Sequence, residues 1–206
     1  MGGANTMNQL IIYFLSVYFA LFFGVAVVWR NYTVAKSTGV NAFKLNQKSG
    51  PEAITGIYFK WLPVLSILIF IVYSFFPNLY MLLGSIELLI STSVKYAGMG
   101  IMTIALVWVA TAQSQMGASW CIGIDHEQKT EFVQRGLFRY SRNPIFVGII
   151  FISLGYFLLL PNPITFAILA LDIALIQIQV AMEEEYLTRL HGQQYRDYCQ
   201  QVRRWL

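Results

Sequence analysis

Five long apolar stretches constrain the fold of this 206-residue chain more than any other feature. The hydrocarbon core of a bilayer requires about 20 mostly apolar residues from each helix that crosses it. The stretches predict spans at 8–29, 57–76, 86–112, 144–160 and 164–182. Only 12% of the residues are charged, against roughly a quarter in soluble domains. We therefore expect an all-α integral membrane protein with about five transmembrane helices in a single domain, residues 1–206.

The flanks of the spans add detail. Glu87 and Lys95 interrupt the beginning of the third span, so its boundary is loosely defined. "PNP" at 161–163 leaves only a tight turn between the last two spans, which predicts an antiparallel hairpin. The first span is too long for a removable signal peptide and lacks both its charged flank and its small-residue cleavage site.

Charge placement predicts the orientation. Every lysine and arginine except Lys95 falls on one side of a five-span arrangement. The positive-inside rule makes that side cytoplasmic, with the N-terminus outside and the C-terminal half facing the cytoplasm. The net charge of +4 is explained by contact with anionic membrane lipids, so no nucleic-acid partner is implied.

The cysteines and histidines predict neither a disulfide nor a metal site. Cys121 and Cys199 both fall on the expected cytoplasmic side, in a reducing compartment. Together with His126 and His191, they show no ligand-like spacing.

Polar residues gather in the C-terminal half, in one segment between the third and fourth spans and another after the fifth. The hairpin brings both segments to the same membrane face. We expect them to be neighbours and to build a site within residues 113–206. A pocket between them would open to the cytosol and sideways to lipid.

The run "FRYSRNPIFVG" marks the beginning of the fourth span. Asn143 suits a helix N-cap and Pro144 suits the first helical position. The free N–H groups there, flanked by Arg139 and Arg142, predict an anion site. The alternative is an ordinary cap with both arginines on lipid phosphates. Gly148 permits close approach of a ligand or of another helix, and helix packing is the usual reason for such a glycine.

Three consecutive acids follow the fifth span. Glu185 has a partner four residues on, Arg189. Glu183 and Glu184 lack a partner at that spacing and are functional candidates, although acids also suit the first turn of a new helix. Within the fifth span, Asp172 is a second-rank candidate, either a hydrogen-bonded helix contact or a residue facing a wet cavity.

Beyond the acids, apolar residues recur at helical spacing. They predict a two-part amphipathic helix folded back along the membrane surface, with Gly192 as the break.

The two polar segments resemble the isoprenylcysteine carboxyl methyltransferase family and the related membrane phospholipid and thiol methyltransferases. The shared pattern is G-x-[YF]-x-x-x-R-[HN]-P-x-[YF]-x-G, then E-E-x-x-L-x-x-x-[FH]-G-x-x-Y-x-x-Y and a late arginine. The matching residues are Gly136, Phe138, Arg142, Pro144, Phe146, Gly148, Glu183, Glu184, Leu187, Gly192, Tyr195, Tyr198 and Arg204. "MGASW", ending at Trp120, is similar to the Gly-x-x-Trp segment of the family.

The resemblance covers roughly residues 113–206, and three positions depart from it. Asn143 stands where the family commonly has His, and Phe138 and Phe146 where it commonly has Tyr.

The resemblance implies S-adenosylmethionine as cofactor, held without a G-x-G-x-x-G loop. Arg142 or Arg139, with the N–H groups of the fourth span, would hold its carboxylate. Glu183 or Glu184 would hold its ammonium or ribose, and Trp120, Tyr195 or Tyr198 its adenine. The catalytic residues expected are Arg142, Glu183 and Arg139. The cofactor contacts expected are Trp120, Tyr140, Arg142, Asn143, Pro144, Gly148, Glu183, Glu184, Tyr195, Tyr198 and Arg204.

The sequence therefore predicts methyl transfer to a lipophilic or prenylated acceptor that enters from the bilayer, with carboxyl O-methylation favoured. A carboxylate beside the sulfonium would stabilise the ground state, so the glutamates are expected away from sulfur. Two alternatives stay open: an NADPH-dependent reductase, because sterol reductases carry a similar Arg-His-Pro segment, and a non-catalytic membrane scaffold. The chemical class of the acceptor and the oligomeric state are left open.

Overall fold

A computed structural model describes residues 2–39, 50–120 and 132–206, and within these ranges the regular elements are all helical. A first helical rod consists of α1 (Gly2–Leu21), a π-helical segment η1 (Phe22–Trp29) and α2 (Arg30–Thr38). The long helices that follow are α3 (Pro51–Phe75), α5 (Thr92–Met116), α6 (Pro144–Leu159) and α7 (Pro163–His191). The expected all-α membrane fold is confirmed.

Shorter elements connect and extend these helices. The elements α4 (Pro77–Met81) and η2 (Glu87–Leu89) lie between α3 and α5, and η3 (Gly117–Ser119) ends α5. The 3-10 turn η4 (Gly136–Arg139) precedes α6, and α8 (Gln193–Gln201) follows α7.

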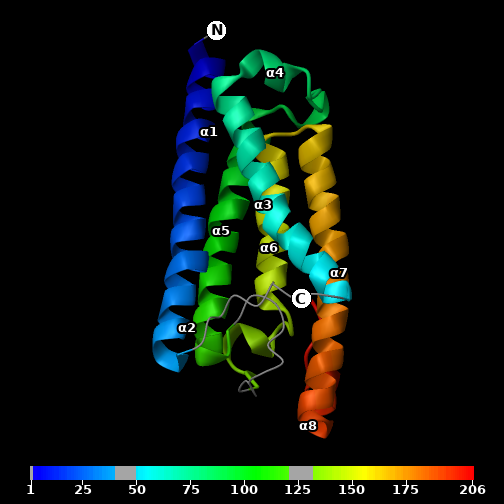
Figure 1. Cartoon of the computed structure of the whole chain (residues 1–206). Coiled ribbons are helices and arrows are strands. Elements are labelled where there is room, and N and C mark those ends of the chain that lie inside the picture. The colour runs from blue at the N-terminus through cyan, green and yellow to red at the C-terminus, as the bar shows by residue number, and fades with distance from the viewer. Residues whose placement is uncertain (1, 40–49, 121–131) are drawn as a thin grey trace.

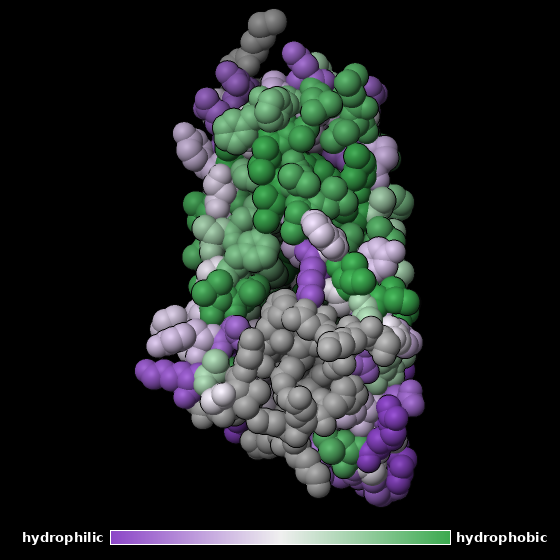
Figure 2. Space-filling model, viewed as in Figure 1, coloured by the Kyte–Doolittle hydropathy of each residue, from purple (hydrophilic) through white to green (hydrophobic). Residues whose placement is uncertain are grey.

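The long helices form an elongated bundle in which α3 crosses in front of α6, between the first rod and α7 (Figure 1). Four helices of the described part are long and apolar enough to cross a membrane: the first rod from Asn5 to Lys36, α3, α5 and α7. Helix α6, with 16 residues, is the shorter fifth. On the face shown in Figure 2, apolar side chains cover the upper and central part, and hydrophilic ones gather toward both ends.

Local signals explain where the helices begin and end. Helix α6 begins at Pro144, as predicted. Asn162 caps α7 by accepting hydrogen bonds from the N–H groups of Ile164 and Thr165, both at 3.0 Å. The predicted turn at 161–163 is present, and α6 and α7 form a hairpin.

The third span differs from its expected bounds. Glu87 lies in the separate turn η2, and α5 begins only at Thr92, after Ser91 accepts a hydrogen bond from the Val94 N–H at 3.2 Å. Helix α5 then continues to Met116, four residues beyond the prediction.

In the C-terminal part, the sequence suggested a new helix at the acids and a helix break at Gly192, and only the break is present. Helix α7 runs through Glu183, Glu184 and Glu185 without interruption, so no new helix begins at the acids. The break lies at Gly192, whose φ of +55° favours glycine. The polar tail is therefore an extension of a span, followed by α8.

Except for Lys95 in the first turn of α5, the described basic residues lie toward one end of the bundle. That end, called the basic end below, holds the C-terminal ends of α2, α5 and α7 and the beginnings of α3 and α6 (Figure 1). Lys44, Lys48 and Lys129 lie outside the described residues. The core between the helices is apolar, with Ile11, Leu15, Met102, Leu159 and Leu160 almost fully buried.

Candidate functional site

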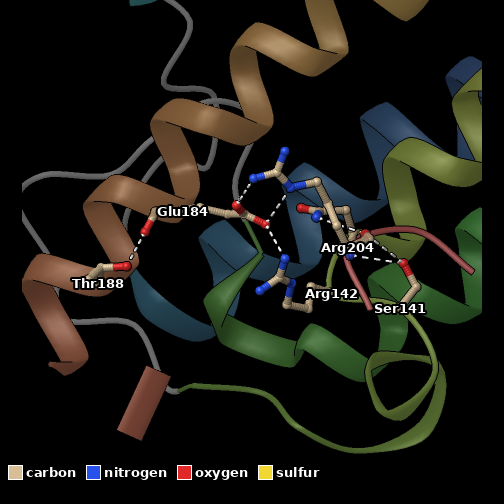
Figure 3. A network of polar contacts seen from close by, with 6 residues as sticks. Ser141, Arg142, Glu184, Thr188 and Arg204 are labelled. Atoms are coloured by element: carbon tan, nitrogen blue, oxygen red, sulfur yellow. Dashed lines mark hydrogen bonds and ion pairs between the residues drawn. The ribbon is translucent and has the colours of Figure 1, made fainter. Parts of the chain in front are cut away.

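One carboxylate binds two arginines at the basic end (Figure 3). Glu184 on α7 accepts from the Arg204 guanidinium through both oxygens, at 3.1 and 2.5 Å, and lies 3.1 Å from Arg142. The side chains of Glu184 and Arg142 are only 14% and 12% exposed. The hydrogen bond to Glu184 raises the pKa of Arg204. Three segments distant in sequence are thus joined by charge-assisted hydrogen bonds.

The backbone of the C-terminal tail is fixed at the same place. The Arg142 N–H donates to the Arg203 carbonyl at 2.9 Å. The Arg204 carbonyl accepts from Asn143 Nδ2 at 3.1 Å and from the Ser141 hydroxyl at 3.4 Å. Ser141 is fully buried. The tail therefore lies across the beginning of α6, and Arg204 is held by both its side chain and its carbonyl.

Asn143 occupies the predicted cap position, but its side chain does not cap the helix. Its amide donates to Arg204 instead, because the returning tail offers a carbonyl there. The first intrahelical bond runs from the Val147 N–H to the Asn143 carbonyl. Within the described part of the chain, no acceptor is recorded for the N–H groups of Ile145 and Phe146. These two groups keep the polarity expected of an anion site.

The structure does not bring Arg139 and Tyr140 into this network. Both are exposed, and their side chains make no polar contact with another described residue. Gly148 packs against α5: an added Cβ would lie 2.4 Å from the Val109 side chain. Gly148 therefore allows close packing of α6 against α5.

Glu183, the other expected acid, belongs to a separate polar chain. Its Oε1 accepts from Gln179 Nε2 at 2.9 Å, and Gln179 Oε1 accepts from the Thr55 hydroxyl at 3.0 Å. Thr55 lies on α3, so these two hydrogen bonds connect α7 to α3. Glu183 therefore has a partner at helical spacing after all, Gln179, whereas the partners of Glu184 come from other segments.

Four aromatic rings pack together beside the ion pairs. Phe132 contacts His191, Tyr195 and Tyr198, with ring centroids 5.1, 5.5 and 5.0 Å away. The Tyr198 hydroxyl donates to the Phe138 carbonyl at 2.6 Å. Burial raises the pKa of Tyr198 to about 12 and also raises that of Tyr195. Both tyrosines are therefore neutral at physiological pH.

Trp120 lies in a different cluster. It is buried against Val34, and the Arg30 guanidinium carbon lies 5.7 Å from the centre of its ring. Arg30 also donates to the Gly117 carbonyl. The "MGASW" segment is thus held by a cation–π contact from the N-terminal rod.

Asp172 is buried between α6 and α7, where it accepts a hydrogen bond from Ser153. This is the helix contact considered from the sequence.

Cys121 and His126 lie outside the described residues. In the described ranges, no group of three His, Cys, Asp or Glu residues is placed to hold a metal ion.

Sequence reasoning missed Gln179, Thr55, Ser141 and Arg30. Gln179 had a signal, because it lies four residues before Glu183 and therefore on the same helix face. The other three make contacts with residues that are distant in the sequence. No spacing rule predicts such contacts.

Comparison with known proteins finds two similarities. Residues 94–194, just under half of the 206 residues, match the phospholipid methyltransferase family. The chain is also similar to the solved structure of a eukaryotic intramembrane Ras methyltransferase, isoprenylcysteine carboxyl methyltransferase, with a TM-score of 0.58 and 23% identity.

That similarity covers 90% of this chain and 64% of the solved one. No curated protein sequence matches the chain at a significant level. The resemblance noted from the sequence is confirmed by the family match and by the shared membrane fold.

Proposed function

From the match of residues 94–194 to the phospholipid methyltransferase family, we propose that the chain is an integral membrane methyltransferase of isoprenylcysteine carboxyl methyltransferase type. It uses S-adenosylmethionine and methylates a lipophilic acceptor, with a carboxylate favoured. One observation carries the proposal: Glu184 binds both Arg142 and Arg204, and the three residues come from separate parts of the shared pattern.

The residues present fit this cofactor. Arg142 Nε is buried without a partner among the described residues, so it is available to a ligand carboxylate, with the N–H groups of Ile145 and Phe146 nearby in sequence. Glu183 suits a donor group of the ligand, and the rings of Tyr195 and Tyr198 suit its adenine.

When bound, S-adenosylmethionine supplies a methyl group on a positively charged sulfur. The chain itself aligns the acceptor, excludes water and orients an acceptor carboxylate by a cation. Of the three candidates Arg139, Arg142 and Arg204, we assign that last task to Arg139, because Arg204 binds Glu184 and Arg142 is assigned to the carboxylate of the cofactor. A prenylated or otherwise lipophilic acceptor would enter between the helices from the bilayer.

We place the basic end in the cytoplasm, following the positive-inside rule. A membrane-impermeant thiol reagent added to intact cells should label Ser85→Cys, at the opposite end, and not Tyr140→Cys. Both residues are exposed, and the native cysteines would be replaced in both variants. The reverse labelling would contradict the orientation.

Calorimetric titration of the detergent-purified protein tests the activity class. S-adenosylhomocysteine should bind at micromolar concentration, and the Arg142→Ala and Glu183→Gln variants should bind it at least about tenfold more weakly, since hydrogen bonds to charged groups contribute about 1.5–3 kcal/mol. The comparisons do not favour the reductase alternative, so NADPH should not bind. Binding of NADPH alone would support that reductase, and binding of neither compound would support the scaffold.

A further inference from the structure

We propose that Thr55 and Gln179 are positioning residues that orient Glu183, so that its second carboxylate oxygen binds the α-ammonium group of S-adenosylmethionine. The inference rests on the proposed function and deepens it, because it assigns the part of the site that receives the cationic end of the cofactor.

The geometry is a relay of two hydrogen bonds across a helix interface. The Thr55 hydroxyl donates to Gln179 Oε1 at 3.0 Å and also lies 3.2 Å from the Glu52 carbonyl. Gln179 Nε2 then donates to Glu183 Oε1 at 2.9 Å. Thr55 and Gln179 are only 2% and 4% exposed. With its oxygen facing Thr55, the amide must present its NH₂ group to Glu183.

This contact engages Oε1 of Glu183. For Glu183 Oε2, no hydrogen-bond donor is recorded among residues 2–39, 50–120 and 132–206. A carboxylate fixed by one oxygen is a directional acceptor, because its free oxygen points in one direction rather than sampling several rotamers.

Charge selects the ligand group. No lysine or arginine of the described part pairs with Glu183, whereas the neighbouring Glu184 is balanced by Arg142 and Arg204. A partly buried carboxylate without a cation is costly, and a ligand cation offsets that cost. The α-ammonium supplies both a positive charge and three N–H donors, which a ribose hydroxyl does not.

The sulfonium is a poor partner for Glu183, because a carboxylate beside it would stabilise the ground state. The assignment to the α-ammonium therefore agrees with catalysis as well as with charge.

Thr55 gives the N-terminal half of the chain a role in the site. It lies on α3, outside the segment that matches the methyltransferase family. Because Thr55 acts only through Gln179, its removal should have a smaller effect than removal of Gln179.

The test compares the affinities of two ligands for two proteins. S-adenosylhomocysteine and an analogue in which hydrogen replaces the amino group would be titrated into the wild-type protein and Gln179→Leu. The wild type should bind S-adenosylhomocysteine at least about tenfold more tightly than the analogue, the size expected for a charged hydrogen bond. Gln179→Leu should reduce that ratio to about two or less and leave the analogue's affinity unchanged.

Threonine variants provide the milder arm. Thr55→Val should weaken S-adenosylhomocysteine binding about threefold and leave binding of the analogue unchanged, and Thr55→Ser should restore the wild-type ratio, as expected for loss and return of one hydrogen bond. Thr103→Val is the matched control, because that exposed hydroxyl donates to the Met99 carbonyl of its own helix and, among the described residues, to no other group. The control should bind like the wild type.

Full discrimination in both Gln179→Leu and Thr55→Val would overturn the inference and leave the proposed function intact. An equal loss for both ligands would also overturn it, by moving Glu183 away from the ammonium. If Gln179→Leu fails to fold, Thr55→Val decides. Failure of the wild type to bind S-adenosylhomocysteine would overturn the proposed function and this inference together.

Discussion

The interior of the bundle and its basic end are held together by different forces. In the interior, α5 and α6 approach through glycines: a Cβ added to Gly98 would lie 2.9 Å from the Gly155 carbonyl oxygen. At the basic end, ion pairs join α7, the segment before α6 and the tail. Small residues let membrane helices pack closely, whereas the attraction within a largely buried ion pair is offset by the cost of removing its charges from water. The comparison indicates that the glycine contact serves folding and the ion-pair network serves binding.

The strongest test of this division removes the charge that joins the two arginines. Glu184→Gln should weaken S-adenosylhomocysteine binding about 100-fold, or about 3 kcal/mol, because both arginines lose a charged acceptor. Calorimetry measures the affinity, and thermal unfolding in detergent measures stability, which should change less.

The matched control for this prediction is the next residue along the helix. Glu185→Gln makes the same chemical change at a side chain that is 71% exposed and 3.7 Å from Arg189. It should leave affinity and stability unchanged. Equal effects of the two substitutions would show that Glu184 acts only through net charge.

Adding a methyl group to the contact between α5 and α6 should affect stability more than binding, the opposite of Glu184→Gln. Gly98→Ala should reduce the free energy of unfolding by about 1–3 kcal/mol, the usual cost of overpacking, because the added Cβ meets backbone as well as side chains. Gly100→Ala, two residues away, has open space around its Cβ and should not destabilise the protein. Thermal unfolding in detergent compares the two. A stable Gly98→Ala protein that fails to bind cofactor would contradict the division.

Within the interior, one polar contact provides an intermediate case. Ser153→Ala leaves the Asp172 carboxylate without its donor and should cost about 1–2 kcal/mol. Ser66→Ala is the control, because its hydroxyl donates to the Leu62 carbonyl of its own helix and to no other group in the described part of the chain. Unchanged unfolding of Ser153→Ala, accompanied by lost activity, would assign Asp172 to a wet functional cavity instead.

The same contrast explains how much of the molecule its sequence predicts. Spans, the α6–α7 hairpin, the helix beginning at Pro144 and the break at Gly192 follow from local rules of hydropathy, proline and glycine. The network does not, because Arg204 reaches Glu184 only after the chain reverses beyond α8.

Competition between possible partners explains the errors. The Asn143 side chain was expected to cap α6, but the Arg204 carbonyl offered it another partner. Arg139 and Arg142 looked equivalent in the sequence, yet only Arg142 faces Glu184. Gln179 was predictable from its spacing to Glu183, whereas its contact with Thr55 depends on how α3 crosses the bundle.

A single hydroxyl at the basic end gives the smallest expected effect. Tyr198→Phe removes the donor to the Phe138 carbonyl, which lies 2.6 Å away, and should cost about 1 kcal/mol of unfolding free energy. Tyr140→Phe, at a residue 69% exposed, should cost nothing measurable. Thermal unfolding at pH 7 compares them.

The pH dependence of this contribution has a defined sign. Burial raises the pKa of Tyr198 to about 12, so the folded state keeps its proton at a pH where the unfolded chain, near pKa 10, begins to lose it. The stabilisation by Tyr198 is therefore complete below pH 10 and declines as the pH rises from 10 toward 12. The stability difference between wild type and Tyr198→Phe should narrow over that interval. If the difference widened over that interval instead, the basic end would stabilise the ionised phenolate of Tyr198 and not its neutral hydroxyl.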